Sequence, residues 1–170
     1  PERLFYACQE VRGSKLVRPS VVEASGVRFH EVQRSSDLYC VCCALARADR
    51  SATVDEVLYH YRVNNPNSNS ATNERAPLDF HRSFVAAKQH LENAGRFAAV
   101  ERGFTNWAAA SVFFNLCSLQ ARDAFEELRR EMQERGCAKL GLDTMKEADY
   151  FDPQTYHPAR HLLFDNTAHF

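Results

Sequence analysis

The chain has 170 residues, 45% of them hydrophobic and 25% charged, with 21 Lys and Arg against 22 Asp and Glu. A folded chain of this length buries about 70% of its unfolded surface, so stability requires neither disulfides nor a structural metal. The composition excludes a disordered or collagen-like chain, and the balanced charge argues against nucleic acid as a partner.

Targeting signals are absent from the sequence. No run of eighteen apolar residues occurs, and residues 1–20 lack the order of a secretory signal. These features predict a cytoplasmic protein without a transmembrane span, with peripheral membrane association left open. The chain begins at Pro1 rather than Met, inside an amphipathic segment, which predicts a fragment of a longer protein.

The first part of the chain predicts short mixed elements. Short strands are expected at about 15–17 and 27–29. Between them lies a two-turn helix that begins at Pro19 and ends at Gly26, because proline favours the first helical position and glycine the position after the last.

A helix and a third strand follow. N-cap residue types at 35–37 precede apolar residues at helical spacing, which predicts a helix from about 37 to 48. The segment 53–63 is rich in β-branched and aromatic residues and runs into a polar Asn/Ser loop. We therefore expect a strand over 53–63.

From Asp79 onward the sequence predicts a helical bundle. The first helix ends at Gly95, and the next, which includes 100–114, is apolar on several sides and is expected to be central. A third helix is predicted to be capped by Asp123 and to end at Gly136. The apolar stripe of the first helix consists of Phe80, Phe84, Ala87 and Leu91.

Signatures of known catalytic sites are missing. The sequence has no Gly-rich phosphate loop, no G-x-S-x-G, no H-E-x-x-H and no Asp-x-Asp. Cys40 and Cys43 share one helical face, whereas Cys42 lies well round from them, and no second Cys-x-x-Cys pair occurs. We therefore predict reduced thiols and no metal site. His157 and His161 are expected to be surface residues.

Asp37 is the carboxylate that stands out. An aspartate directly before an apolar helix is commonly an N-cap. A carboxylate at a helix start, flanked by Ser35 and Ser36 and facing a cleft, can also accept a proton from an incoming hydroxyl. Spacing alone leaves both interpretations open.

His60 and Arg62 form the second candidate site. Alternation along a strand places these two side chains on one face and Tyr59 and Tyr61 on the other. A cationic, hydrogen-bonding face that ends at a polar loop suits a phosphate group. The alternative is an edge strand with a solvated face.

Five short motifs follow one another between residues 10 and 75. They are Lys15-Leu16, the run 26–29, Ser36-Asp37-Leu38-Tyr39, the run 54–62 and Asn67-Ser68-Asn69-Ser70. In this order they resemble the C-terminal half of a bacterial family 2 glycosyltransferase with a GT-A fold. Residues 76–135 resemble that family only in helical character.

The resemblance implies a fold and a set of roles. The fold would be α+β, mostly α and partly GT-A, with an acceptor-side portion at 1–76 and a helical region packed on it at 77–170. Asp37 would be the catalytic base of an inverting sugar transfer from a nucleotide-sugar to a hydroxyl. The residues expected to bind the substrate are His60, Arg62, Asn67 and Ser68.

The chain also departs from the family pattern. Ser36 stands where the family has a glutamate, and Gly13-Ser14 replaces a Trp-Asn pair. The N-terminal nucleotide-sugar-binding half with its Asp-x-Asp is missing. The resemblance therefore implies a chain that is inactive alone, with that half and a carbohydrate acceptor as its partners. A divalent cation, Mg²⁺ or Mn²⁺, is expected only in the complete enzyme, and no cofactor in this chain.

Two further expectations concern association. The alternative to an enzyme fragment is a non-enzymatic helical interaction module, in which Asp37 is only a cap. Uncovered strand edges predict a homodimer whose interface includes residues from 1–20 and 51–63 and exceeds roughly 1,000 Å².

Overall fold

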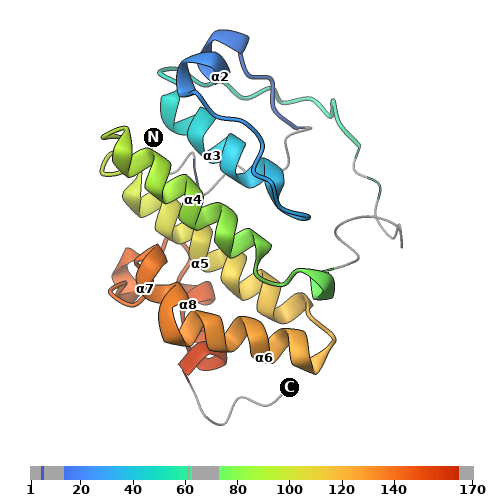
Figure 1. Ribbon diagram of the computed structural model, residues 1–170. Coiled ribbons are helices and arrows are strands. Elements are labelled where there is room, and N and C mark those ends of the chain that lie inside the picture. Colours follow the sequence, from blue (N-terminus) through green and yellow to red (C-terminus); the bar gives the residue numbers. More distant parts are fainter. Residues whose placement is uncertain (1–4, 6–13, 61, 63–72, 165–170) are drawn as a thin grey trace.

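The computed structural model describes residues 5, 14–60, 62 and 73–164, and the regular elements that it describes are helices (Figure 1). Met132–Gly136 (η3) is a π-helix and Glu147–Asp149 (η4) a 3-10 helix. The α-helices are α2 (Pro19–Ser25), α3 (Ser36–Arg47), α4 (Asp79–Asn93), α5 (Glu101–Ser118), α6 (Arg122–Glu131), α7 (Cys137–Leu140) and α8 (Pro153–Phe164).

The predicted α+β class is wrong. The described residues contain no strand and no sheet, so the strands expected at 15–17, 27–29 and 53–63 are not formed there, and neither is the sheet portion of a partial GT-A fold. The chain is all-α over its described part. A strand needs a neighbour for its backbone N–H and C=O groups, and the described segments offer none. Residues 53–60 are instead irregular and exposed.

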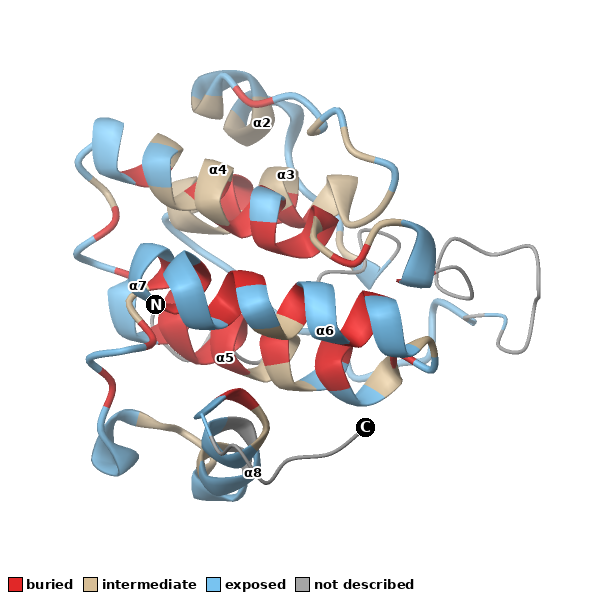
Figure 2. Cartoon of the chain, turned by 60° about the horizontal axis from the view of Figure 1, so that its bottom comes forward, coloured by how far each residue is buried: buried red, intermediate tan, exposed pale blue. Residues whose placement is uncertain are grey.

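The helices are stacked in layers around one core (Figure 2). α2 packs on α3, and α3 packs on α4. α4 contacts α5 and α7, while α5 also contacts α6 and α8. Buried residues cluster where α3, α4, α5 and α6 face one another. One hydrophobic cluster therefore joins α3 to the helices that follow the boundary expected near residue 76.

α4 confirms its sequence pattern. Its expected stripe is buried throughout. The helix ends at Asn93, and Gly95 adopts a positive φ of 64°. The Gly95 N–H donates to the Glu92 carbonyl and the Arg96 N–H donates to the Leu91 carbonyl, which satisfies two carbonyls at the helix end. Gly95 is thus the predicted stop.

α5 is the central helix, as expected from its composition. Buried side chains lie on several of its sides, including Phe104, Trp107 and Val112, although Phe114 is exposed. It is also the longest of the described helices, with 18 residues. Neither α5 nor any other described helix is long and apolar enough to cross a membrane.

The region after α5 differs from the expectation in two places. Asp123 does not cap α6, because the helix already begins at Arg122. The backbone N–H groups of Gln120 and Ala121, just before the helix, donate instead to the Glu74 carboxylate. Gly136 does not end the helix either, because the chain continues through η3 and α7 as far as Leu140. Gly141, with a φ of 79°, is the stop.

Candidate functional site

Asp37 lies in the first turn of α3 rather than at its N-cap. The helix begins one residue before Asp37, and the N-cap residue is Ser35, which has a φ of 52°. The Asp37 side chain is partly exposed and has no hydrogen bond to another described residue. Its carboxylate is therefore not used to cap the helix, which removes the structural role that the sequence suggested for it.

The turn that leads into α3 is bound by a carboxylate from α4. Asp79 is 3% exposed. Its Oδ2 accepts hydrogen bonds from the backbone N–H groups of Gln33 and Arg34, at 3.0 and 3.2 Å. Its Oδ1 accepts from Arg82 Nη1 at 3.2 Å. A charged acceptor makes each of these bonds stronger than a neutral pair would.

Two further contacts join this turn and α3 to α4. His30 Nδ1 shares a hydrogen bond with the buried Ser83 hydroxyl at 3.1 Å. The Tyr39 hydroxyl shares one with His90 Nδ1 at 3.4 Å, and the His30 and Tyr39 rings lie 5.7 Å apart. Burial raises the pKa of Tyr39, so its hydroxyl remains protonated at neutral pH. The start of α3 is thus tied to α4 at three positions.

The structure does not join His60 and Arg62 to Asp37. Both are exposed, and no hydrogen bond or ion pair between described residues connects either of them to Asp37. The argument that they share a strand face fails, because no strand forms over 53–60. The other predicted substrate-binding residues, Asn67 and Ser68, lie outside the described residues.

Large apolar side chains are exposed on three irregular segments, which are residues 14–18 before α2, residues 26–35 between α2 and α3, and residues 48–60 after α3. Leu16 is fully exposed, and Val57 and Leu58 are 78% and 70% exposed. A soluble monomer seldom leaves many such side chains close together in sequence without a partner surface. The exposed large apolar residues of these segments are Leu16, Val17, Phe29, Val54, Val57, Leu58 and Tyr59.

The described residues contain no group of three or more His, Cys, Asp or Glu side chains arranged to hold a metal ion. A divalent cation normally takes several oxygen ligands, and a structural zinc takes four ligands. This part of the chain therefore does not fit the divalent cation that the family resemblance implies for the complete enzyme.

Thiol reactivity should follow burial. Cys117 is exposed, whereas burial raises the pKa of Cys43 to about 12 and that of Cys137 to about 11. The thiolate is the reactive form, so iodoacetamide at pH 8 should label Cys117 well before Cys43 and Cys137. Peptide mapping by mass spectrometry measures the order in which the three thiols are labelled. Equal labelling rates in the folded protein would contradict this prediction. Stoichiometric zinc in chelator-free protein would contradict the separate prediction that the cysteines hold no metal.

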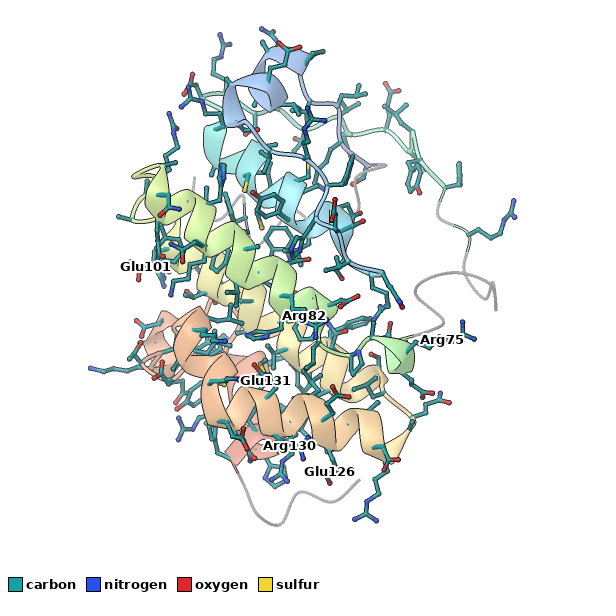
Figure 3. The ribbon with its side chains drawn as sticks, in the orientation of Figure 1. Arg75, Arg82, Glu101, Glu126, Arg130 and Glu131 are labelled. Atoms are coloured by element: carbon teal, nitrogen blue, oxygen red, sulfur yellow. The ribbon has the colours of Figure 1, made fainter. Side chains whose placement is uncertain are left out.

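A buried polar cluster joins α4 to α6 and η3. His81 is 4% exposed, and its Nδ1 lies 3.9 Å from Oε1 of Glu131, which in turn pairs with Arg135 at 2.6 Å. Figure 3 labels Glu131 on α6 and Arg82 on α4. The hydrogen bond from Arg135 lowers the pKa of the Glu131 carboxyl. His81 Nε2 is buried with no hydrogen-bond partner among the described residues.

The chain should lose stability in mild acid because of His81. Burial lowers the pKa of His81 to about 4; Glu131 opposes this shift, and nearby Lys139 and Arg135 add to it. In the unfolded chain, therefore, His81 takes up a proton near pH 6.5, whereas in the folded chain it takes up this proton only near pH 4. Over this window the free energy of unfolding should fall as the pH falls, by up to about 3 kcal/mol.

Urea unfolding at pH 7 and pH 5 measures this effect. His81→Phe should flatten the pH dependence, because the phenyl ring fills a similar space and takes no proton. His157→Gln is the matched control, since the His157 side chain is 70% exposed. An unchanged slope in His81→Phe would assign the acid sensitivity to other groups.

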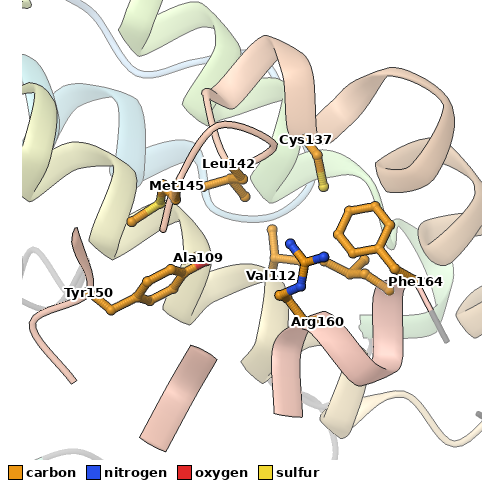
Figure 4. Close-up of a pocket in the computed structure, with 9 residues that line it drawn as sticks. Ala109, Val112, Cys137, Leu142, Met145, Tyr150, Arg160 and Phe164 are labelled. Carbon is orange, nitrogen blue, oxygen red and sulfur yellow. The ribbon is translucent and has the colours of Figure 1, made fainter. Parts of the chain in front are cut away.

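A cavity of about 20 Å³ lies between α5, α7 and α8 (Figure 4). Arg160 and Phe164 reach over it from α8, opposite Leu142 and Cys137. This volume holds about one water molecule. It is far smaller than the roughly 300 to 1,000 Å³ of small-molecule sites, so it is not a substrate pocket.

Sequence reasoning missed Asp79 and Ser83. The sequence indicates only that both lie in a helix, and an acidic residue in a first helical turn, such as Asp79, ordinarily needs no explanation beyond the helix dipole. Their partners lie 46 and 53 residues away along the chain. No local sequence pattern indicates a contact between residues this far apart in the chain.

Comparisons with known protein families, with curated proteins and with solved structures found no match to this chain. The functional interpretation therefore depends on its motifs and on the geometry of the turn before α3.

Proposed function

We propose that this chain is the acceptor-side, C-terminal part of a nucleotide-sugar-dependent glycosyltransferase that acts in the cytoplasm, with Asp37 as its catalytic base. The observation that carries the proposal concerns Asp37, which is a partly exposed carboxylate that does not cap α3 and lies just after a backbone turn that is hydrogen-bonded to α4. A base must be open to its substrate and fixed in direction. The order of the motifs that resemble family 2 glycosyltransferases supplies the reaction class.

In this reaction the Asp37 carboxylate takes the proton of an acceptor hydroxyl. The hydroxyl oxygen then forms a bond to the anomeric carbon of the donor sugar while the bond from that carbon to the nucleotide diphosphate breaks. The electron pair of the broken bond leaves with the diphosphate. A single displacement of this kind inverts the anomeric configuration.

His60 and Arg62 are proposed to contact the departing diphosphate, together with Asn67 and Ser68. Exposure of His60 and Arg62 leaves both side chains accessible to a ligand. An arginine suits a phosphate because its planar guanidinium can donate two parallel hydrogen bonds. The donor-binding half, and any divalent cation with it, would come from outside this chain.

The exposed apolar segments support a missing partner surface. Val54, Val57 and Leu58 stand on the segment that follows α3, the helix that carries Asp37, and Leu16 stands on the segment that precedes α2, which packs on α3. Burying such side chains contributes about 25 cal/mol per Å² of apolar area removed from water. A donor-binding half placed against these segments would gain that free energy.

A nucleotide-sugar transfer assay tests the proposal. The complete enzyme, in which residues 1–170 are joined to the donor-binding half, should release nucleotide diphosphate and extend a carbohydrate acceptor in the presence of Mg²⁺ or Mn²⁺. Residues 1–170 alone should do neither. A complete protein without any transfer would favour a non-enzymatic helical interaction module instead.

The same apolar segments predict self-association of the isolated chain. We expect a homodimer whose interface includes residues from 1–20 and 51–63 and buries more than about 1,000 Å² in total. Multi-angle light scattering at tens of micromolar measures it. Val57→Ser with Leu58→Ser should shift the chain toward a monomer, whereas Phe114→Ser, on α5, should not. A wild-type monomer at that concentration would contradict the prediction.

A further inference from the structure

We propose that Asp79 is a positioning residue for Asp37, an inference that rests on the proposed function. Asp79 stands at the first position of α4, 42 positions beyond Asp37 in sequence, and its hydrogen-bond partners are Gln33, Arg34 and Arg82 rather than Asp37. It acts through the backbone turn that precedes α3.

The contact is specific to the turn. Two consecutive amides, those of Gln33 and Arg34, donate to the same oxygen of Asp79. Paired amides of this kind form a small concave site for an anion. Because Asp79 is buried, little water competes for these bonds and its carboxylate is held in one orientation.

The two hydrogen bonds from the Gln33 and Arg34 amides to Asp79, called the clamp below, lie close to the candidate base along the chain. Arg34 is followed by Ser35, whose φ of 52° makes it the one described residue other than glycine with a positive φ. Ser36 then begins α3 and Asp37 follows. A sparsely populated backbone conformation persists only where its surroundings enforce it. Asp79 binds the residue next to Ser35 and so helps to fix the direction in which α3 begins.

Attachment of α3 to α4 does not depend on Asp79. Leu38, Val41 and Cys42 of α3 are buried in the same cluster as Phe80 and Phe84 of α4. The apolar contact therefore keeps the helices together when the clamp is removed. What the clamp adds is the geometry of the turn, and that geometry determines where the Asp37 carboxylate lies.

Steady-state kinetics of the complete enzyme tests the inference. Asp79→Ala should lower kcat by about tenfold to a hundredfold, because a base misplaced by about 1 Å loses that much rate. The KM for the nucleotide-sugar should stay within about twofold, since binding of the donor does not involve the turn. Rates are normalised to the folded fraction measured by circular dichroism at the assay temperature, so partial unfolding does not mimic the result.

Two variants provide the controls. Asp79→Asn keeps one acceptor oxygen for the two amides and should restore most of kcat. Arg82→Gln removes the partner of the other carboxylate oxygen, leaves the clamp intact and should match the wild type. If Asp79→Ala does not fold, Asp79→Glu replaces it, because the longer side chain shifts the acceptor oxygen and should also lower kcat.

The outcomes separate this inference from the proposed function. A normal kcat in the folded Ala or Glu variant, in an enzyme that Asp37→Asn inactivates, overturns the positioning role alone. A fall in kcat together with an equal rise in KM also overturns it. Absence of transfer in the wild-type complete protein overturns the proposed function, and the positioning role with it.

Discussion

Asp37→Asn is expected to abolish sugar transfer by the complete enzyme. An amide cannot take up the proton of the acceptor hydroxyl, so the rate should fall by about a hundredfold to ten-thousandfold, the usual contribution of a general base. The KM for the nucleotide-sugar should change little. Initial rates at saturating donor and acceptor measure the effect.

The matched control is Asp49→Asn, because Asp49 is an exposed carboxylate just beyond the end of α3. It should keep the wild-type rate. Asp37→Asn should also leave the urea midpoint of the 170-residue chain nearly unchanged, because Asp37 does not cap α3 and has no described hydrogen-bond partner. Turnover retained in Asp37→Asn would remove Asp37 from the mechanism.

Phe84→Ala is expected to be the most destabilising of the substitutions considered. Phe84 is completely buried, and its ring meets those of Phe104 and Trp107 edge-on at 5.4 and 5.5 Å. Truncation removes these contacts and leaves a cavity between α4 and α5, so the free energy of unfolding should fall by about 3 to 5 kcal/mol. Domains of this kind are stable by only about 5 to 15 kcal/mol.

Phe114→Ala is the control for the same chemical change, because Phe114 is 64% exposed on α5. Its effect on the free energy of unfolding should stay within about 0.5 kcal/mol. Urea denaturation followed by circular dichroism compares the two variants. A loss below about 1 kcal/mol in Phe84→Ala would mean that the core around α4 and α5 is packed differently.

The helices could be predicted because their signals are local. The stripe from Phe80 to Leu91 recurs at spacings of three and four, and Gly95 supplies the positive φ that ends the helix. α3 was placed to within one residue at each end, since apolar spacing and N-cap residue types agree there. Gly136 shows the limit of such signals, because it is buried within η3 and the chain stays helical as far as Leu140.

The absence of strands from the described residues could not be predicted, because strand formation depends on a partner strand that local sequence does not reveal. The β-branched and aromatic residues of 53–63 fit a pleated sheet, but propensity of this kind mainly reflects packing against neighbouring strands. The described residues provide no such neighbour, and Val54, Val57 and Leu58 are exposed. Local composition therefore favoured a strand that the described residues do not form, because it carries no information about neighbouring strands.

Only part of the candidate site could be predicted from the sequence. Asp37 could be found because it precedes an apolar helix. The contacts that hold its turn could not, because Asp79 is 46 positions from Gln33 and Ser83 is 53 positions from His30. Contacts at such separations follow from the packing of α3 on α4, which local patterns do not encode.

The most direct test of the account is the stereochemical course of the reaction. Proton NMR of the anomeric signal, recorded while the complete enzyme turns over a nucleotide-sugar and a hydroxyl acceptor, gives the configuration of the first product. If Asp37 acts as the base, the acceptor oxygen attacks the anomeric carbon directly in a single displacement. The account therefore predicts a transferred sugar with inverted configuration. A product with retained configuration, or no transferred sugar at all, would contradict it.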